Sequence, residues 1–411
     1  MREVVITHGV RTPIATIGKS LRDISAAELG RLVAEELLRE RAKLPPTELD
    51  HVVMGQVKQS AEPSNIARVV ALAAGIPETV PAYTVHRQCG SGLQAIMDAC
   101  QMILCGDAEA VMAGGAENMS QSVYFMRDSR AGLGNGDYRI EDSLTAGGPG
   151  AIPAAVYGSQ PMGVTAENLA ERYGISRRRQ DEFAQASQEK AALAILEGRF
   201  KEQILPVAIN GPKGPALFDT DEHPRLTDLG KLADLRPVFK QDGGVTAGNS
   251  SGRNDGAALV LVMSGEKASK LGYRPLARVR AMAASGCDPT VMGLGPVECS
   301  RRALERAGIG IQDLDVIELN EAFAAQSIAV MEEWKAWGID EDSLARKINP
   351  NGGAIALGHP LGCTGAALTV KCVYELLRVP ENRYGLITLC CAGGLGVAMI
   401  IEKTAAGRTE A

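Results

Sequence analysis

The segment HRQCGSGLQAI, residues 86–96, has the residue types for nucleophilic attack on a carbonyl group. It follows a β-rich run at 81–85 and precedes a helical pattern, which places Cys89 at a strand-to-helix turn. The N–H groups and partial positive charge at a helix N-terminus favour a thiolate, the nucleophilic form of cysteine. The neighbouring glycines let a substrate carbonyl approach the backbone. The pattern predicts a nucleophilic Cys89, and a buried small residue at a tight turn is the alternative.

A second segment, NPNGGAIALGHPLGCTG at 349–365, places His359 in a glycine-lined loop before a helix. A histidine with a pKa near its usual value of about 6.5 is the common partner for activating a thiol. The absence of large side chains around the ring would let it reach a neighbouring element. We therefore predict that His359 is the base that serves Cys89, and a loop residue bonded to backbone is the alternative.

Two further segments place polar side chains where expected strands end. In ITLCCAGGLG, residues 387–396, a strand leads into a glycine turn, and Cys390 is a candidate general acid or base. Strand alternation would turn Cys391 to the other face, and ordinary core filling is the alternative for both cysteines. In ELNEAFA, residues 318–324, Asn320 can orient a water or the imidazole, or cap a helix. Ligands of α/β sheets bind at such loops after strands, so we expect these segments to meet.

The elements that must position these residues follow an α/β pattern. Short β-rich runs alternate with helical periodicity, an arrangement typical of sheets covered by helices. Helices are expected at 26–41 and 296–307, where apolar residues recur at helical spacing. Strands are expected at 4–7, 51–55, 81–85, 110–113, 257–263, 276–283, 316–319, 386–389 and 397–402.

The first and last thirds of the chain carry the same signals in the same order, which indicates a duplicated unit. The pairs Leu49/Leu314, Ser91/Thr364 and Ala113/Ala392 are offset by 265, 273 and 279 residues, and Ser91 and Thr364 are each expected to open a helix. Chance matching of common residues is the alternative. Between the thirds lies a segment rich in Gly, Pro and charge, with one strong helix expected at about 176–198.

These patterns predict three regions. An N-terminal half comprises residues 1–120 and about 245–270, an inserted loop domain comprises 121–244, and a C-terminal half comprises 271–403. Long insertions of this kind are usually lids, binding loops or assembly surfaces.

Composition excludes several classes of protein. The 411 residues are 45% apolar and 22% charged, a globular balance far from that of disordered chains. Lys and Arg total 43 against 49 Asp and Glu, so the net charge of −6 argues against a nucleic-acid partner. No apolar run approaches the roughly 18 residues of a membrane span, and no signal peptide is expected. Nine cysteines without paired CxxC spacing favour a reducing, cytoplasmic location over a disulfide framework or structural zinc.

Taken together, the four segments resemble the thiolase family. Further stretches similar to thiolases lie at 10–14, 114–120, 162–168 and 245–256, so the resemblance runs nearly end to end. It implies a thiolase fold, with two duplicated α/β halves in α-β-α-β-α layers and an inserted loop domain. It also implies an acyl-CoA:CoA C-acyltransferase that cleaves 3-ketoacyl-CoA with CoA, or condenses acyl-CoA with acetyl-CoA, with a role in fatty acid metabolism.

The resemblance also implies roles for individual residues. Cys89 would carry the acyl group, His359 would activate it and donate to the thioester oxygen, and Cys390 would move the α-proton of the acetyl unit. Asn320 would hold an oxyanion-hole water, and the backbone N–H groups of Cys89 and Ala392 would form a second hole. The positions expected to line the acyl and pantetheine channel are Met162, Ala247 and Ser251.

The same resemblance implies the partners. They are acyl-CoA, acetyl-CoA and CoA, with CoA acting as substrate and with no metal or other cofactor. A homodimer or homotetramer is expected, since thiolases form such assemblies.

Two departures from the thiolase pattern matter. Pro161 stands where biosynthetic thiolases often carry histidine, which argues against assigning acetoacetyl-CoA specificity and leaves chain length open. Ala392 replaces a glycine and would slightly reshape the second hole. Two alternatives remain: a decarboxylating condensing enzyme of the ketosynthase type, which lacks the second catalytic cysteine, and a non-catalytic acyl-CoA binding or assembly subunit.

Overall fold

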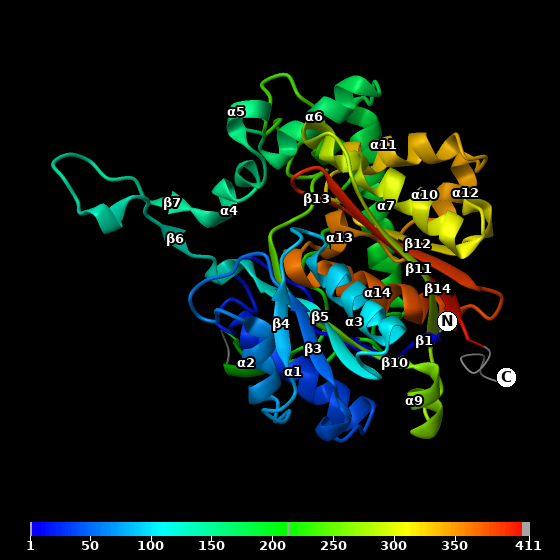
Figure 1. The fold of residues 1–411 in the computed structure, drawn as a ribbon. Coiled ribbons are helices and arrows are strands. Elements are labelled where there is room, and N and C mark those ends of the chain that lie inside the picture. Colours follow the sequence, from blue (N-terminus) through cyan, green and yellow to red (C-terminus); the bar gives the residue numbers. More distant parts are fainter. Residues whose placement is uncertain (1, 212–213, 405–411) are drawn as a thin grey trace.

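A large mixed sheet runs through the centre of the protein (Figure 1). The computed structural model describes residues 2–211 and 214–404. The sheet has ten strands, one of which, β2 (Ala15–Thr16), pairs only with β10. The other nine follow the order β12 (Val316–Leu319), β13 (Tyr384–Cys391), β14 (Leu395–Lys403), β11 (Ala277–Gly286), β1 (Val4–Arg11), β10 (Asn254–Ser264), β5 (Ala110–Asn118), β3 (His51–Gly55) and β4 (Ala82–Val85).

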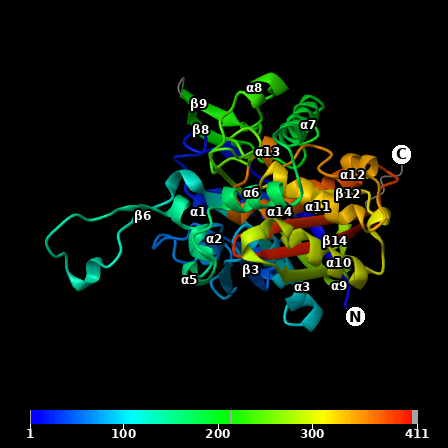
Figure 2. The ribbon, with the colours of Figure 1, turned by 90° about the horizontal axis from the view of Figure 1, so that it is seen from above.

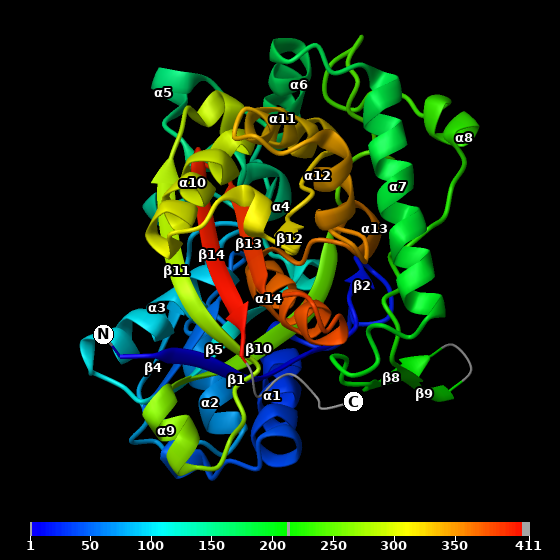
Figure 3. The ribbon, with the colours of Figure 1, turned by 90° about the vertical axis from the view of Figure 1, so that its right-hand side faces the viewer.

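Helices form three layers around the two halves of this sheet, as the side view shows (Figure 3). The central pair, α3 (Ser91–Cys105) and α14 (Leu361–Arg378), contacts strands of both halves. The N-terminal half is covered by α1 (Ala26–Glu35) and α2 (Ile66–Ala73), and the C-terminal half by α10 (Gly295–Ala307) and α11 (Ala324–Lys335). The predicted layered α/β class is confirmed.

Alternation along the strands explains the layering. In β10, Val260 and Val262 enter the core around α3 and α14, while Leu259 and Leu261 enter the core beneath α1 and α2. A strand that is buried on both faces is apolar at successive positions, as the sequence of this strand is. The two central helices lie close together, because a Cβ on Gly92 of α3 would lie 2.6 Å from the carbonyl oxygen of Gly362.

The two halves repeat one strand pattern. In the first, β3 pairs with β5 in parallel and β5 pairs with β10 antiparallel. In the second, β12 pairs with β13 in parallel and β13 pairs with β14 antiparallel. Only residues 392–394 join β13 to β14, whereas residues 119–253 lie between β5 and β10. One detail of the predicted repeat is wrong: α14 begins at Leu361, so Thr364 lies within its first turn and does not open the helix. The proposed domain limits stay a prediction.

Residues 119–253 hold more regular structure than the sequence predicted. The strong helix expected at about 176–198 is α7 (Arg177–Leu196), but α6 (Met162–Arg172) was not predicted. Its buried stripe contains Gly163, Thr165 and Glu167, so the apolar periodicity is weak. The remaining elements of this region are β6 (Tyr124–Phe125), β7 (Glu141–Asp142), α4 (Ser143–Ala146), α5 (Ala154–Tyr157), β8 (Val207–Gly211), β9 (Gly214–Phe218) and α8 (Leu229–Ala233).

An arm that carries β6 and β7 extends away from the body, as two views show (Figures 1 and 2). The helix expected at 26–41 is α1 followed by a π-helical turn at Glu36–Arg41. The other helices are α9 (Gly265–Lys270), α12 (Glu341–Lys347) and α13 (Ala354–Leu357). Within the described ranges, no helix combines the length and apolar character that a membrane crossing requires.

A buried ion pair fastens the region between β5 and β10 to the sheet. The Arg11 guanidinium, at the end of β1, donates to both carboxylate oxygens of Asp221 at 2.7 and 2.8 Å. Both side chains are almost fully buried, with 1% and 0% exposed. Arg11 also donates to Gln203 Oε1 at 2.9 Å, so one side chain holds two separate segments.

Replacing Arg11 with methionine is expected to lower the free energy of unfolding by about 3–5 kcal/mol, because Asp221 would stay buried without its partner. Urea unfolding followed by circular dichroism measures this loss. The matched control is Lys270→Met, which removes an ammonium from an exposed pair with Glu266 and is expected to change the free energy of unfolding far less. Equal effects of the two substitutions would contradict the assignment.

Candidate functional site

Cys89 lies at a constrained turn between β4 and α3. The residue before it, Gln88, adopts a left-handed backbone conformation with φ 46, which is uncommon for a residue other than glycine. Ser91, the first residue of α3, fastens this turn: its Oγ accepts the Arg87 N–H at 2.8 Å and donates to the Gln88 carbonyl at 2.6 Å. Cys89 itself is partly exposed. The turn thus presents this thiol in a defined direction.

The turn between β13 and β14 meets the Cys89 sulfur. The backbone N–H groups of Ala392 and of Cys89 itself lie close enough to this sulfur to lower its pKa. A Cβ on Gly90 would lie 2.7 Å from Cys391 Sγ, so the two segments are in direct contact. Cys390 is close enough that a charge on Cys89 raises its pKa further, after the larger effect of burial. The structure therefore brings Cys89, Cys390 and Ala392 together.

Burial raises the pKa of Cys89 to about 11, although the N–H groups of Ala392 and Cys89 oppose the shift. The prediction that the helix N-terminus makes Cys89 a thiolate is therefore wrong for the free protein. Desolvation of the sulfur outweighs the nearby dipoles. A base must remove the Cys89 proton when the thiol reacts.

His359 is held in one orientation and one tautomer. Its Nδ1 lies 2.7 Å from Thr364 Oγ1, and that hydroxyl donates its only hydrogen to the Pro360 carbonyl at 2.9 Å. This arrangement assigns the ring proton to Nδ1 and makes Nε2 the basic nitrogen of the ring. The backbone N–H of His359 donates to Asn254 Oδ1 at 2.9 Å and fixes the loop. The ring thus presents a basic nitrogen at Nε2.

Burial also lowers the pKa of His359 to about 4. The expectation of an ordinary histidine pKa is wrong, because the ring is enclosed by the loop and by α14 and no carboxylate supports its charge. At neutral pH the imidazole is uncharged and able to accept a proton. At neutral pH both side chains are therefore uncharged, Cys89 as a thiol and His359 as an imidazole.

Asn320 lies beside the histidine and does not cap a helix. Its backbone N–H donates to the Thr388 carbonyl at 3.0 Å, and its Nδ2 lies 3.5 Å from His359 Nε2. The following helix, α11, starts only at Ala324. Asn320 Oδ1 is fully buried and has no hydrogen-bond partner among residues 2–211 and 214–404. A buried amide oxygen of this kind is a natural acceptor for an ordered water.

The two adjacent cysteines face opposite ways, as strand alternation predicts. Cys391 belongs to the apolar core around α3 and α14. Cys390 instead packs in a separate cluster with Met162, Ala166, Val245, Met292, Ala322 and Phe323. Burial raises the pKa of Cys390 well above its usual value, so this thiol stays protonated at neutral pH.

Two of the three predicted channel residues, Met162 and Ser251, contact this cluster. Met162 begins α6 beside Cys390, and the Ser251 N–H donates to the Ala322 carbonyl at 3.0 Å. Ala247 lines a cavity of about 280 Å³. The same cavity contains basic and apolar side chains, among them Arg225, Lys231, Leu232 and Leu235.

Three buried polar residues that the sequence did not single out hold these loops in place. Glu117 accepts the N–H groups of Val57 at 2.9 Å, Lys58 at 3.0 Å and Gly362 at 2.8 Å. It thereby ties the loop after β3 to the His359 loop. Glu321 likewise accepts from Asn349, Ser187 and Ile355, and Asn254 accepts from His359. All three lie inside glycine-rich or polar motifs, and this position is the only feature of the sequence that could have identified them.

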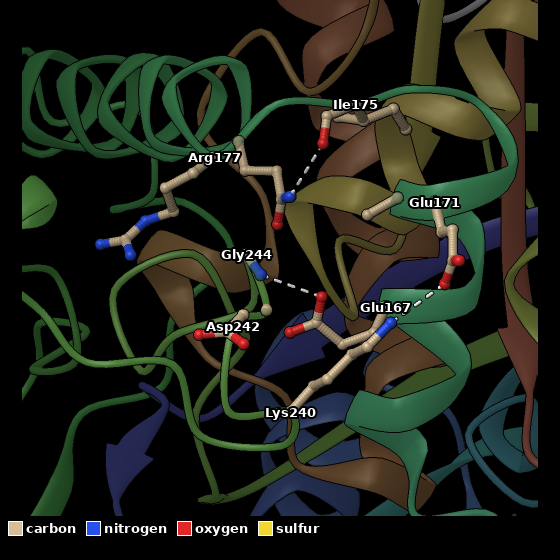
Figure 4. Close-up of a pocket in the computed structure, with 10 residues that line it drawn as sticks. Glu167, Glu171, Ile175, Arg177, Lys240, Asp242 and Gly244 are labelled. Atoms are coloured by element: carbon tan, nitrogen blue, oxygen red, sulfur yellow. Dashed lines mark hydrogen bonds and ion pairs between the residues drawn. The ribbon is translucent and has the colours of Figure 1, made fainter.

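A further cavity of about 320 Å³ opens between α6, the start of α7 and the 240–244 loop (Figure 4). It contains none of the predicted site residues, but its wall supports them. Glu167 accepts the N–H groups of Gly244 at 2.9 Å and Val245 at 2.8 Å, which places Val245 in the Cys390 cluster. Lys240 pairs with Glu171 at 3.0 Å across the same opening.

The whole chain is similar to known thiolases. Family models described as the N-terminal and C-terminal domains of thiolase match residues 4–266 and 273–403. The chain is 48% identical to Beta-ketothiolase BktB of Cupriavidus necator over 406 residues, which cover 98% of this chain and 99% of that protein. It is 47% identical to Acetyl-CoA acetyltransferase of Syntrophomonas wolfei over 405 residues, with the same coverage. The chain belongs to the thiolase family.

Solved structures agree in fold. The human mitochondrial 3-ketoacyl-CoA thiolase superposes with a TM-score of 0.92 at 41% identity, covering 98% of this chain and 99% of that one. An acetyl-CoA acetyltransferase of Bacillus anthracis superposes with a TM-score of 0.91 at 43% identity and the same coverage.

Proposed function

We propose that this protein is an acyl-CoA:CoA C-acyltransferase that cleaves 3-ketoacyl-CoA with CoA and, in reverse, condenses an acyl-CoA with acetyl-CoA. The observation that carries the proposal is the direct contact between the Cys89 turn and the turn after β13, which brings together two thiols and the N–H groups of Cys89 and Ala392. The Glu117 carboxylate fastens the loop of the neutral base His359 to the same region. The names of the relatives support this activity.

Acylation starts when Cys89 Sγ attacks the C3 ketone and His359 Nε2 takes the thiol proton. The N–H groups of Cys89 and Ala392 donate to the oxygen that becomes negative, an effect worth about 3 kcal/mol of barrier. The C2–C3 bond then breaks, leaving the acyl group on Cys89 and an acetyl-CoA enolate. A water held by Asn320 Oδ1, together with His359, stabilises the enolate oxygen, and the Cys390 thiol donates a proton to C2.

Deacylation restores the starting protonation states of Cys89, His359 and Cys390. The Cys390 thiolate takes the proton of an incoming CoA thiol, and the CoA sulfur attacks the acyl carbon on Cys89. The Cys89 thiolate leaves and recovers its proton from His359. In this scheme coenzyme A is a substrate and three side chains carry the protons, so the proposal includes no metal and no resident cofactor.

The cavity beside Ala247 is proposed to receive the nucleotide part of CoA. Arg225, whose Nη2 also donates to the Ala247 carbonyl at 2.9 Å, and Lys231 supply positive charge for phosphates. Leu232 and Leu235 supply an apolar surface for the adenine.

We further propose a homodimer or homotetramer in the cytoplasm, acting in fatty acid metabolism. The arm that carries β6 and β7 exposes the apolar side chains Tyr124, Leu133, Tyr138 and Ile140, a pattern typical of an assembly surface. All nine cysteines are free, as a reducing compartment favours. Light scattering that detects only monomer would remove the assembly proposal.

The pH dependence of kcat/KM is expected to be a broad plateau. The pKa of His359 is lowered to about 4 and that of Cys89 is raised to about 11, so the base stays unprotonated and the thiol stays protonated between these values. Activity should fall only below about pH 5, as His359 gains a proton. Initial rates of thiolysis in overlapping buffers test this, with recovery at pH 7 as the control for unfolding. A midpoint near pH 6.5 would contradict it.

The experiment that tests the function is incubation with acetyl-CoA followed by peptide mass spectrometry. The result expected is one acetyl group on Cys89, together with thiolysis across a panel of 3-ketoacyl-CoA chain lengths. Release of CO2 from a malonyl thioester would instead favour a decarboxylating condensing enzyme. The second thiol, Cys390, favours thiolysis, because enzymes of the ketosynthase type lack it. Binding of CoA with no thiolysis and no Cys89 adduct would indicate a non-catalytic subunit.

A further inference from the structure

A half-buried ammonium group lies at the edge of the proposed acyl site. Lys58 follows β3, and its backbone N–H donates to Glu117 Oε1 at 3.0 Å. Its Nζ donates to the Ser143 carbonyl at 2.6 Å, and a Cβ on Gly147 would lie 2.4 Å from the same Nζ. The Lys58 side chain therefore points to the junction between the loop after β3 and residues 143–147.

The segment that Lys58 meets also borders the reacting groups. A Cβ on Gly148 would lie 3.1 Å from Met162 Cγ, and a Cβ on Gly393 would lie 3.2 Å from the Ala151 carbonyl oxygen. Residues 143–151 thus contact Lys58, the Met162 end of α6 and the turn that follows Cys390. This segment forms a wall of the acyl site, and the ammonium lies at one end of that wall.

The Lys58 charge is close to the nucleophile and has no carboxylate partner. Among the described residues, no carboxylate oxygen lies within 4.0 Å of Nζ. The Lys58 ammonium and a Cys89 thiolate nevertheless stabilise each other electrostatically. An ammonium has three N–H donors, and one bond to a carbonyl leaves the others for a ligand or water.

The acidic groups nearby are engaged elsewhere. Glu117 accepts three backbone N–H groups, and Asp142 caps α4 by accepting from Leu144 N–H at 2.9 Å and Thr145 Oγ1 at 2.7 Å. Burial has the largest effect on the Lys58 pKa and lowers it, the charges of Glu117 and Asp142 raise it, and repulsion by the exposed Arg253 has a smaller lowering effect. An anion bound to the remaining N–H groups of Lys58 would offset the cost of burying the ammonium.

We propose that Lys58 selects an acyl chain that ends in a carboxylate, so that the preferred substrate is a short 3-oxo-dicarboxylyl-CoA. This inference rests on the proposed thiolase activity and adds its substrate class. With a six-carbon chain, 3-oxoadipyl-CoA, Cys89 bonds to C3 as the C2–C3 bond breaks. The enzyme then carries a succinyl group, and acetyl-CoA leaves after C2 receives the Cys390 proton. CoA removes the succinyl group as succinyl-CoA.

The test compares two substrates of equal length that differ only in charge, 3-oxoadipyl-CoA and 3-oxohexanoyl-CoA. The wild-type protein should favour the carboxylate substrate by about tenfold or more in kcat/KM, as expected for a charge-assisted hydrogen bond. Lys58→Met should lower that ratio about tenfold or more, because it removes the charge and keeps the length of the side chain. Lys58→Arg should keep the preference, and Lys270→Met on the far surface should change nothing.

The ratio separates selectivity from a general effect of Lys58 on Cys89, which would change both substrates alike. A wild-type protein that cleaves the neutral substrate at least as well, or a ratio that Lys58→Met leaves unchanged, would overturn the inference while thiolase activity stands. As a second readout, succinyl-CoA should acylate Cys89 faster than butyryl-CoA does, and Lys58→Met should remove the difference. Absence of cleavage and of Cys89 acylation with every substrate would overturn the proposed function itself.

Discussion

Replacing Cys89 with alanine is expected to lower thiolysis by about four orders of magnitude or more and to abolish the acyl adduct. The substitution removes the atom that forms the covalent bond, and neither thiol at the end of β13 is expected to take its place. Cys390 has a pKa raised well above its usual value by burial, and Cys391 lies in the core between the two halves. Removal of a catalytic nucleophile from an enzyme of this kind leaves only the contribution of binding and of oriented N–H donors.

The measurement is the rate of 3-ketoacyl-CoA cleavage, with intact-protein mass after exposure to acetyl-CoA. Cys105→Ala is the matched control, because Cys105 is an exposed thiol at the last position of α3, the helix that Cys89 precedes. It should keep full activity and the adduct. An unchanged adduct in Cys89→Ala would show that another residue carries the acyl group.

The sequence predicted the strands of the sheet well, because most of them are buried and apolar. The expected strands at 51–55 and 316–319 match β3 and β12 at both ends. By contrast, α6 was missed because its buried face carries glycine, threonine and glutamate, which periodicity does not detect. The start of α14 was placed too late, since Pro360 and not the Thr364 region precedes its first turn.

The site residues were found by type and motif, but their electrostatics were not predictable from the sequence. A helix N-terminus suggested a thiolate at Cys89, and the glycine-rich loop suggested an ordinary pKa for His359. Both pKa shifts depend on how far the folded chain excludes solvent from the side chain. At Cys89, the effect of burial on the pKa is larger than the effect of the nearby N–H groups. The tautomer of His359 likewise depends on a hydroxyl five residues away, Thr364.

The buried carboxylates that hold the loops of the site in place could not be predicted from the sequence for a related reason. Glu117 joins N–H groups from Val57 and Gly362, which are hundreds of positions apart in the chain. Glu321 similarly accepts from Ser187 of α7 and Ile355 of the His359 segment. A carboxylate in a single sequence gives no sign of which distant backbone groups it will satisfy. Lys58 was overlooked because its position at the proposed acyl site depends on residues 143–151, which fold against it.

Replacing Cys390 with alanine is expected to lower kcat for thiolysis by about two to four orders of magnitude while the protein stays folded. The acetyl-CoA enolate would form without a positioned proton donor, and proton transfer by a positioned group contributes about this much. Burial holds the Cys390 pKa well above its usual value, so the thiol carries the proton that C2 needs. Cys89 would remain in place and should still react with an alkylating agent, which shows that the nucleophile is intact.

Cys391 provides a matched control one residue away. Cys391→Ala removes the same atoms from the core around α3 and α14, so it should lower the free energy of unfolding by about 1–3 kcal/mol and leave kcat within a few-fold. The pair therefore separates chemistry from packing: one substitution should affect turnover and the other stability. A folded Cys391→Ala protein that has lost turnover, beside an active Cys390→Ala protein, would reverse the assignment, because the register of β13 would then place the other sulfur at the reacting carbon.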